Sequence, residues 1–183
     1  MIKIRSTFDE KKTTQAAAFL IKKSGNTLNY TKLIKLLYLA DREAFKEFER
    51  PISGDSYVSM PKGPVLSNTY ELISYPNKSY WHRHIKKMDY DVCLSDDPGV
   101  SLLTPNELTV LENIYDQHKN RDWKAMINYC HKCCGEWQHP GDTSIPIRVD
   151  DILKALNKTE REVEIITSEI ASINYVKGLL RAS

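Results

Sequence analysis

Apolar residues recur at helical spacing in the first third of the chain. Between residues 8 and 24 they form one apolar face, and Gly25 follows where a helix would end. Between residues 30 and 50 they recur at i, i+4, i+7 and i+11, and further large apolar residues widen the stripe until Pro51. These patterns predict two helices, and we expect much of the second helix to be buried.

The next part of the chain has an extended and turn-rich pattern. Glycine and proline punctuate residues 52–65 around a short alternating run at 55–60, which predicts a strand with a turn on each side. A short helix is expected over 67–74, with Ser67 as its cap. Alternation returns at 88–94, so we expect a second strand there that pairs antiparallel with the first.

Four further helices are predicted in the second half of the chain. Thr104-Pro105-Asn106-Glu107 combines a capping residue, a proline and a capping-box glutamate, and predicts a helix to about residue 120. Helices over 122–135 and 150–156 are expected on either side of a loop that is rich in Gly and Pro. One side of a final helix over 159–181 is apolar: Val163, Ile166, Ile170, Ile173, Val176 and Leu180.

Taken together, the patterns predict a mainly α fold of the α+β class. At 183 residues the length fits one domain, with no internal repeat. We therefore expect a single compact helical domain over residues 1–183, with six or seven helices and a small antiparallel sheet of two or three strands. The helical share should lie well above the usual third of residues.

Composition narrows the class of protein. With 41% hydrophobic and 27% charged residues, the chain can bury a core. Its longest apolar run, 16–21, is far too short to cross a membrane, and the N-terminus lacks the apolar stretch of a secretory signal. We therefore expect a cytoplasmic protein with no membrane association, whose four cysteines are reduced thiols.

Charge is nearly balanced in total but uneven along the chain. The net charge of +2 is too small for a domain that mainly tracks phosphates. Residues 1–50 carry 11 Lys and Arg against 6 Asp and Glu, whereas residues 91–120 carry 1 against 6. The sequence therefore leaves open a basic patch.

A cysteine and histidine cluster near residue 130 is the first candidate for metal chemistry. Zinc favours four sulfur or nitrogen ligands, and Cys-x-x-Cys is a common half-site, but no second pair follows at the usual spacing. We therefore expect no metal and no cofactor, and interpret the cysteines as buried packing residues. The cluster comprises Cys130, His131, Cys133, Cys134 and His139.

The sequence contains no familiar catalytic motif. There is no nucleophile elbow, phosphate loop, His-Glu-x-x-His or dinucleotide fingerprint. Cys130 and His131 are neighbours on a predicted helix and point about 100° apart, so they cannot form a nucleophile and base pair. We expect no catalytic residues and no enzyme activity. A metal-dependent hydrolase that uses the cysteine and histidine cluster is the remaining enzyme hypothesis.

Two groups of side chains could bind a partner. Asp41 and Arg42 lie beside the apolar stripe of the long helix, and we favour a structural ion pair or a loop-pinning cap over a binding role. The second group is the aromatic and basic segment 80–84. It resembles an interface anchor or a platform for single-stranded nucleic acid, and His82 and His84 share a face if this segment is extended. Alternatively, Trp81 folds back onto the long helix. The partner-binding candidates are Tyr80, Trp81, His82 and Arg83, with His84 two residues beyond His82.

Residues 32–65 resemble the signature of the Panacea domain, the domain of SocA-like antitoxins. The block has a Lys-Leu-x-Lys-Leu-Leu-Tyr-x-Ala-Asp helix, then Pro-Ile-x-Gly-Asp, an aromatic residue and a Gly-Pro-Val turn. A later His and Trp also resemble landmarks of the family, and the resemblance covers about residues 9–156. Matching positions include Lys32, Lys35, Leu36, Tyr38, Asp41, Pro51, Gly54, Asp55, Tyr57, Gly63, Pro64, Val65, His131 and Trp137.

The resemblance implies a mainly helical antitoxin of a type II-like toxin–antitoxin system, of a kind also carried by prophages. Such a protein neutralises a cognate toxin by direct contact, and the resemblance also admits an adaptor that delivers the toxin to a protease. Self-association into a homo-oligomer is a further open alternative. The alternative is a nucleic-acid-binding regulator, suggested by the positive first fifty residues and the aromatic and basic group around Trp81. Because glycine and proline fix backbone shape, we expect the matching residues to be scaffold and the toxin-binding surface to lie elsewhere.

Overall fold

The structure is a computed structural model that describes residues 8–182, apart from the side chains of residues 177 and 180–182. Its helices are α1 (Glu10–Lys23), α2 (Tyr30–Phe48), α3 (Ser67–Ser74), α4 (Tyr80–His84), α5 (Pro105–His118), α6 (Trp123–Cys133), α7 (Val149–Ala155) and α8 (Glu160–Ala182). Its strands are β1 (Thr27–Asn29), β2 (Tyr57–Met60), β3 (Gly63–Leu66), β4 (Ile85–Met88), β5 (Asp91–Leu94) and β6 (Ile145–Ile147).

Helices make up 57% of the structure, which confirms the predicted mainly α fold of the α+β class. The described residues contain eight helices and two three-stranded sheets, rather than six or seven helices and one sheet. The extra helix is the short α4, and the extra strands are short segments that periodicity over a few residues does not separate from loops.

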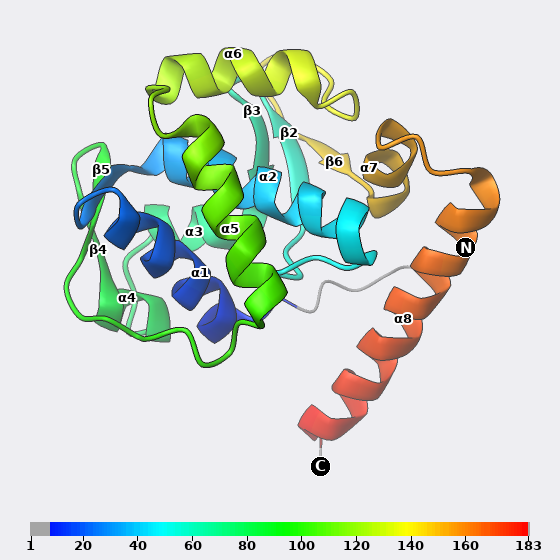
Figure 1. Ribbon diagram of the computed structural model, residues 1–183, viewed down its shortest axis with the longest axis horizontal. Coiled ribbons are helices and arrows are strands. Elements are labelled where there is room, and N and C mark those ends of the chain that lie inside the picture. The colour runs from blue at the N-terminus through cyan, green and yellow to red at the C-terminus, as the bar shows by residue number, and fades with distance from the viewer. Residues whose placement is uncertain (1–7, 183) are drawn as a thin grey trace.

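Helix α2 lies at the centre of the fold (Figure 1), with α1, α5, α6 and α7 packed around it. Asn29 caps its start by accepting hydrogen bonds from the N–H groups of Thr31 and Lys32. The helix ends at Phe48, and Glu49, which caps it, adopts the left-handed conformation with φ of 62°. Twelve of its 19 residues are buried, as the width of its apolar stripe predicts.

Two antiparallel sheets complete the fold. The first has the strand order β1-β5-β4 and lies beside α4, and in its register Leu28 faces Val92. The second has the order β3-β2-β6 and lies near α6 and α7 (Figure 1). In the second sheet Tyr57 faces Leu66 on one side and Ile147 on the other.

The predicted pairing of residues 88–94 with the strand at 55–60 is wrong. Residues 85–94 form the β4–β5 hairpin, which turns at Asp89 and Tyr90 and pairs with β1. Asp89 has a φ of 52°, the left-handed conformation that tight hairpin turns require. Alternation fixes which face of a strand is buried but does not choose the neighbouring strand.

Strand β6 lies inside the segment that we expected to be loop. Pro146 stands at its middle, and proline cannot donate a hydrogen bond to a ladder. The strand accordingly occupies an edge of its sheet, where one side needs no partner. Its shortness and its proline conceal it from the hydrophobic pattern.

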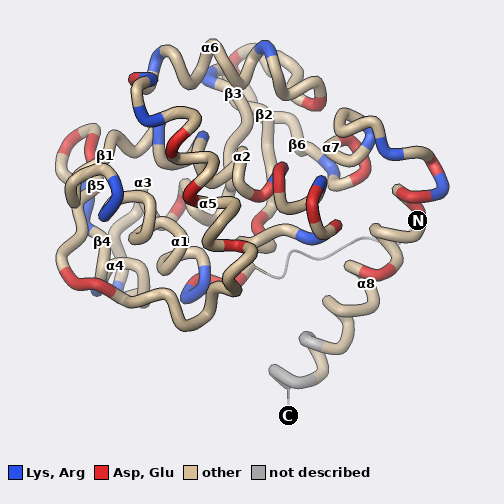
Figure 2. The backbone as a smooth tube through the Cα atoms, in the orientation of Figure 1, with Lys and Arg blue, Asp and Glu red and all other residues tan. Residues whose placement is uncertain are grey.

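The uneven charge along the chain is neutralised in space. The ammonium of Lys12 lies 2.6 Å from a carboxylate oxygen of Glu107, and that of Lys23 lies 2.5 Å from Glu112. Lys22 pairs with Asp97 at 2.6 Å. Figure 2 shows the resulting mixture of blue and red where α1 and α5 lie together. The positive first fifty residues therefore do not form a basic patch along α1.

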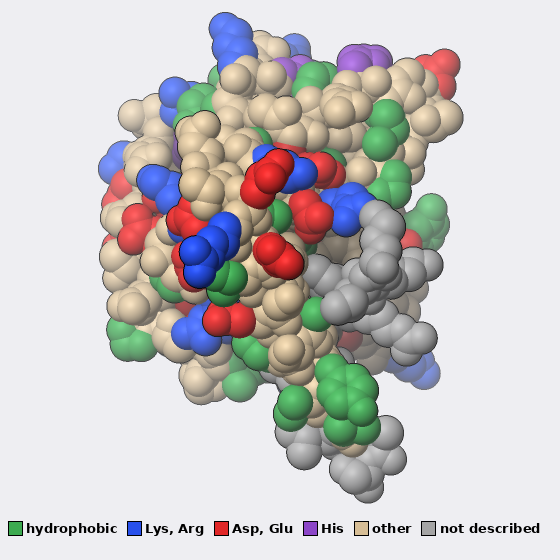
Figure 3. Space-filling model, turned by 90° about the vertical axis from the view of Figure 1, so that its right-hand side faces the viewer, with side chains coloured by type: hydrophobic (Ala, Val, Ile, Leu, Met, Phe, Trp, Pro, Cys, Tyr) green, Lys and Arg blue, Asp and Glu red, His purple; other side chains and the backbone are tan. Residues whose placement is uncertain are grey.

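Helix α8 leaves the body of the molecule as it proceeds (Figure 1). Its later apolar residues Ile173 and Val176 are 45% and 52% exposed, and apolar side chains gather at the projecting end in Figure 3. Leu180 of the predicted stripe lies outside the described side chains. Among the described residues no helix is both long and apolar enough to span a membrane. The buried part of the stripe is Val163, Ile166 and Ile170.

Residues 80–84 form a helix, so His82 and His84 do not share the face of an extended segment. Trp81 is 1% exposed and belongs to the hydrophobic core. Its N–H donates to a carboxylate oxygen of Glu10 at 2.9 Å, and α4 packs on α1. The structure therefore selects the core interpretation of Trp81 over the surface-anchor interpretation, in a short helix that packs on α1.

We predict that Trp81→Ala lowers the free energy of unfolding by about 3–5 kcal/mol, because it leaves a large cavity against α1. Denaturant unfolding followed by circular dichroism measures the loss. Tyr75→Ala is the matched control, since Tyr75 is 69% exposed, and should change stability by less than about 0.5 kcal/mol. Equal unfolding midpoints for the two variants would contradict the core assignment.

Candidate functional site

The residues of the family signature meet at one place, although they come from four segments. They line the contact between α2, the loop before β2, the β2–β3 hairpin and the segment at the end of α6. Many of them are polar and buried. We define these side chains and their partners as the polar core.

Asp41 fixes the loop that follows α2. One of its carboxylate oxygens accepts from the N–H groups of Ile52 and Ser53, at 2.8 and 2.9 Å. The other accepts from the Ser53 hydroxyl and from the Tyr57 hydroxyl, the latter at 2.8 Å. Burial raises the pKa of Asp41 to about 6, and the hydrogen bonds from Ser53 oppose that rise. The expected loop-pinning role of Asp41 is therefore confirmed.

Asp55 performs the capping that we assigned to Ser67. Its carboxylate accepts from the N–H groups of Asn68 and Thr69, at 2.9 and 3.0 Å, and from the Thr69 hydroxyl at 2.7 Å. These are the first free N–H groups of α3, and the residue before α3, Leu66, offers no side-chain cap. Ser67 is instead the first residue of the helix. Sequence spacing could not reveal a cap that comes from twelve residues upstream.

Lys35 is a buried cation with an uncharged partner. It is 1% exposed, and its ammonium donates to the carbonyl oxygen of Pro64 at 2.7 Å. Burial lowers the pKa of Lys35 from 10.5 to about 8. Gly63 has a φ of 97°, and a Cβ there would lie 3.2 Å from the Lys35 Nζ atom, so the glycine both permits the turn and leaves space for the lysine.

Glu136 joins the segment after α6 to α2, and no pattern in the sequence pointed to this residue. Its fully buried carboxylate accepts from the Tyr38 hydroxyl at 2.7 Å and from Arg42 Nε at 2.9 Å. This ion pair confirms the structural role expected for Arg42. The second carboxylate oxygen has no hydrogen-bond partner among the described residues. Burial, followed by the charge of Glu136, raises the pKa of Tyr38.

His131 and Trp137 stack on each other beside the β2–β3 turn. Their ring centroids lie 3.9 Å apart and their planes differ by 13°. The indole N–H of Trp137 donates to the carbonyl oxygen of Met60 at 3.0 Å. Burial and the nearby Lys35 lower the pKa of His131. The two late landmarks of the signature thus hold the segment after α6 against the hairpin.

The remaining signature residues also face inward. Lys32 is 8% exposed and donates to the carbonyl oxygen of Lys119 at 2.9 Å, which ties α2 to the end of α5. Gly54 has a φ of 65° in the loop that Asp41 holds. The others are buried or partly buried in the same region: Leu36, Pro51, Gly63, Pro64 and Val65.

The residues of α4 that we expected to bind a partner are either buried in the core or in contact with side chains of the same segment. Trp81 is buried, and Tyr80 packs on the His84 ring at 4.6 Å between centroids. Nδ1 of His82 lies 2.8 Å from the Ser79 hydroxyl. Arg83 alone of the four candidates is exposed. These residues therefore do not form a continuous exposed aromatic surface.

The cysteines near residue 130 lie in and beside the core. Cys130 and Cys134 are 0% and 1% exposed, and the sulfur atoms of Cys133 and Cys134 are 3.8 Å apart. The hydrogen bond to Cys134 and burial raise the pKa of Cys133, so its thiol is protonated at neutral pH. Among the described residues no group of three or more His, Cys, Asp or Glu is placed to hold a metal ion.

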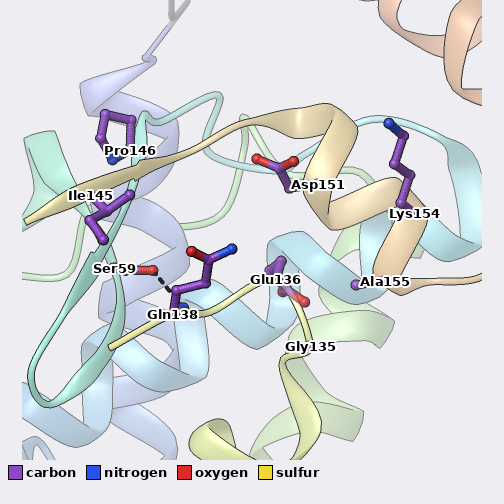
Figure 4. A pocket seen from close by; sticks show the side chains of 9 residues that line it. All are labelled: Ser59, Gly135, Glu136, Gln138, Ile145, Pro146, Asp151, Lys154 and Ala155. Atoms are coloured by element: carbon purple, nitrogen blue, oxygen red, sulfur yellow. Dashed lines mark hydrogen bonds between the residues drawn. The ribbon is translucent and has the colours of Figure 1, made fainter. Parts of the chain in front are cut away.

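A hollow of about 310 Å³ opens beside the polar core, between the segment after α6 and the β6–α7 connection (Figure 4). Ser59 lines it and accepts from the N–H of Gln138 at 3.2 Å. Asp151, on the opposite side, accepts from the N–H of Arg148 as part of a capping box. Ser59 and Asp151 are thus engaged with the protein's own backbone, whereas one carboxylate oxygen of Glu136, which also lines the hollow, has no hydrogen-bond partner among the described residues.

The fold and the polar core define a small helical domain whose signature residues bind one another. The family model described as "Antitoxin SocA-like, Panacea domain" matches residues 33–138, more than half of the chain. The chain therefore belongs to the Panacea-domain family of SocA-like antitoxins. The match is narrower than the resemblance over residues 9–156. Neither the curated proteins nor the solved structures contain a significant match to the chain.

We predict that Asp41→Ala destabilises the protein by about 3 kcal/mol or more, because it leaves the N–H groups of Ile52 and Ser53 buried without an acceptor. Guanidinium unfolding measures the change. Glu43→Ala, two positions away on the same helix, removes only a surface pair with Lys46 and should cost less than about 1 kcal/mol. Similar losses for both variants would show that Asp41 does not pin the loop.

The buried Lys35 predicts a pH dependence of stability. Because its pKa is about 8 in the folded protein and 10.5 ordinarily, the unfolded chain binds more protons between these values, and stability rises with pH. The free energy of unfolding of wild type, minus that of Lys35→Met, should therefore increase by on the order of 1 kcal/mol per pH unit from about pH 8 to 10. Urea unfolding at several pH values measures it, with exposed Lys86→Met as the control. A difference independent of pH would rule out a shifted Lys35.

Proposed function

We propose that this protein is an antitoxin that neutralises a cognate protein toxin by binding it directly, without chemistry of its own. The observation that carries the proposal is the match of residues 33–138 to the SocA-like antitoxin family. In a toxin–antitoxin pair the antitoxin needs a stable surface of the right shape and charge, and a rigid scaffold lowers the entropic cost of presenting it.

The structure supports a binding role through the way in which it uses the signature residues. The signature residues Asp41, Asp55 and Lys35 each bind groups of the protein itself, and so does Glu136, which lies outside the signature. They stabilise the contact between α2 and the later segments, and each lies buried away from a partner. Direct contact with a toxin then falls to the exposed residues that this scaffold positions.

Co-expression tests the proposal. Each reading frame adjacent to the gene is induced alone and together with this chain, and growth is recorded. We expect one neighbour to arrest growth, the chain to restore it, and the two proteins to co-purify as a complex. Tyr75→Ala should rescue as wild type does, whereas Trp81→Ala should lose rescue through loss of folding. Failure of the wild-type chain to relieve any neighbour's arrest would contradict the proposal.

The amount of toxin in the rescued cells separates neutralisation by binding from delivery to a protease. Binding alone leaves the toxin at or above its level without the chain, because complex formation removes none of it. A protease adaptor would lower the toxin level. Inactivation of the protease would then slow the loss of the toxin. Immunoblotting of a tagged toxin after translation is stopped measures the difference.

A further inference from the structure

Helix α6 presents a basic and aromatic surface to solvent, which we call the α6 face. It is centred on the β2–β3 turn and comprises Lys62, Trp123, Lys124, Lys132, Trp137 and His139. Figure 2 shows Lys and Arg at several points along α6, and Figure 3 shows His beside Lys and Arg along the same upper edge of the molecule.

Helical geometry places the α6 lysines outward. Met126 and Cys130 are fully buried, which fixes the inner side of α6. At 100° per residue, Lys124 and Lys132 point to the opposite side, and both are exposed. Trp123 lies on the flank that faces the β2–β3 turn.

Aromatic rings flank the turn on both sides. The ammonium groups of Lys62 and Lys124 lie 5.9 and 5.3 Å from the Trp123 ring, as cation–π pairs. On the other side of the turn Trp137 stacks on His131 and meets the edge of His139, at 5.8 Å between centroids. Both tryptophans are partly exposed. Large rings that are fixed in place and ringed by charge are typical of binding hot spots.

Within the described residues no ion pair joins Lys62, Lys124 or Lys132 to a carboxylate. Residues 119–139 contain four Lys or Arg, of which Lys119 pairs with Asp116 at 3.2 Å, and two acidic residues. Of the acids, Asp122 caps α6 at the N–H of Ala125, and Glu136 is buried against Arg42. The lysines of α1, by contrast, pair with carboxylates near α5. The lysines of the α6 face are therefore free to meet carboxylates on another molecule.

We propose that the α6 face is the surface on which an acidic face of the toxin docks. This inference rests on the proposed antitoxin function and assigns it a location. Carboxylates of the partner would pair with Lys62, Lys124 and Lys132, while the edges of Trp123 and Trp137 form the apolar centre. Opposite charges also speed the encounter of the two proteins, as rapid capture of a toxin requires.

A protein partner fits the α6 face better than a nucleic acid does. Base stacking needs an open ring face, but the Trp137 ring is stacked on His131 and in T-shaped contact with His139, and two ammonium groups lie over the Trp123 ring. The net charge of the whole chain is only +2. Carboxylates need neither an open ring face nor a long basic track, because they pair with single ammonium groups.

Charge reversal tests the proposal with the toxin found by co-expression. The double variant Lys62→Glu with Lys124→Glu should weaken binding of the purified toxin at least about tenfold in titration calorimetry and abolish rescue. The matched control Lys86→Glu with Lys87→Glu makes the same charge change on β4, where both lysines are exposed, and should bind within about twofold of wild type. Melting temperatures of both variants show that each remains folded.

A second variant and the salt dependence complete the test. Trp123→Ala should weaken toxin binding while it retains the wild-type circular dichroism spectrum, and added salt should weaken wild-type binding more than binding by the double variant. If the double variant rescues and binds as wild type does, the α6 face is not the docking site, while the antitoxin function stands. If wild type itself fails to rescue, both proposals fall. Binding of a fluorescent oligouridine by wild type and not by the double variant, with toxin affinity unchanged, would assign the face to RNA and overturn the inference.

Discussion

The burial of α2 requires partners for the polar groups that this helix carries into the interior. A buried polar or charged group without a hydrogen bond costs roughly 1–3 kcal/mol, and more when it is charged. Lys35, Tyr38 and Asp41 all lie on the helix and are at most 2% exposed. Their partners come from β3, from the segment after α6 and from the loop before β2. Any conformation that buries α2 must therefore also bring those three segments to it.

This requirement explains why the signature of the family is discontinuous. The helix motif, the Gly-Pro-Val turn and the late His and Trp are far apart in sequence, yet each satisfies a group that another one buries. Gly63 leaves space for Lys35, and Trp137 fastens the turn that holds Gly63 through Met60. Loss of one member leaves the others unpaired. Exposed residues outside the set can change without disturbing the fold.

The polar core also decides which surface is available for binding. It holds the β2–β3 turn against the start and end of α6. This places Lys62 beside Trp123, and the stacked rings of His131 and Trp137 lie next to the turn. The α6 face is thus built on rigid elements rather than on a loose loop, and little ordering entropy is lost on binding. The lysines of α1, by contrast, pair with carboxylates on α5 or in the chain before it. The unpaired lysines of the α6 face are therefore a consequence of where the fold places its carboxylates.

Local structure could be predicted from the amino-acid sequence wherever one segment decides its own conformation. The apolar stripe of α2, the capping box at Thr104 and the structural role of Asp41 all follow from residues that lie near one another in the chain. The tertiary structure alone decided the pairings between distant segments. Alternation did not choose β1 as the neighbour of the β4–β5 hairpin, and composition did not place Trp81 under α1 or Glu136 against Tyr38. Such choices depend on which distant groups fit the same space and satisfy the same hydrogen bonds, and periodicity within one segment carries no information about that fit.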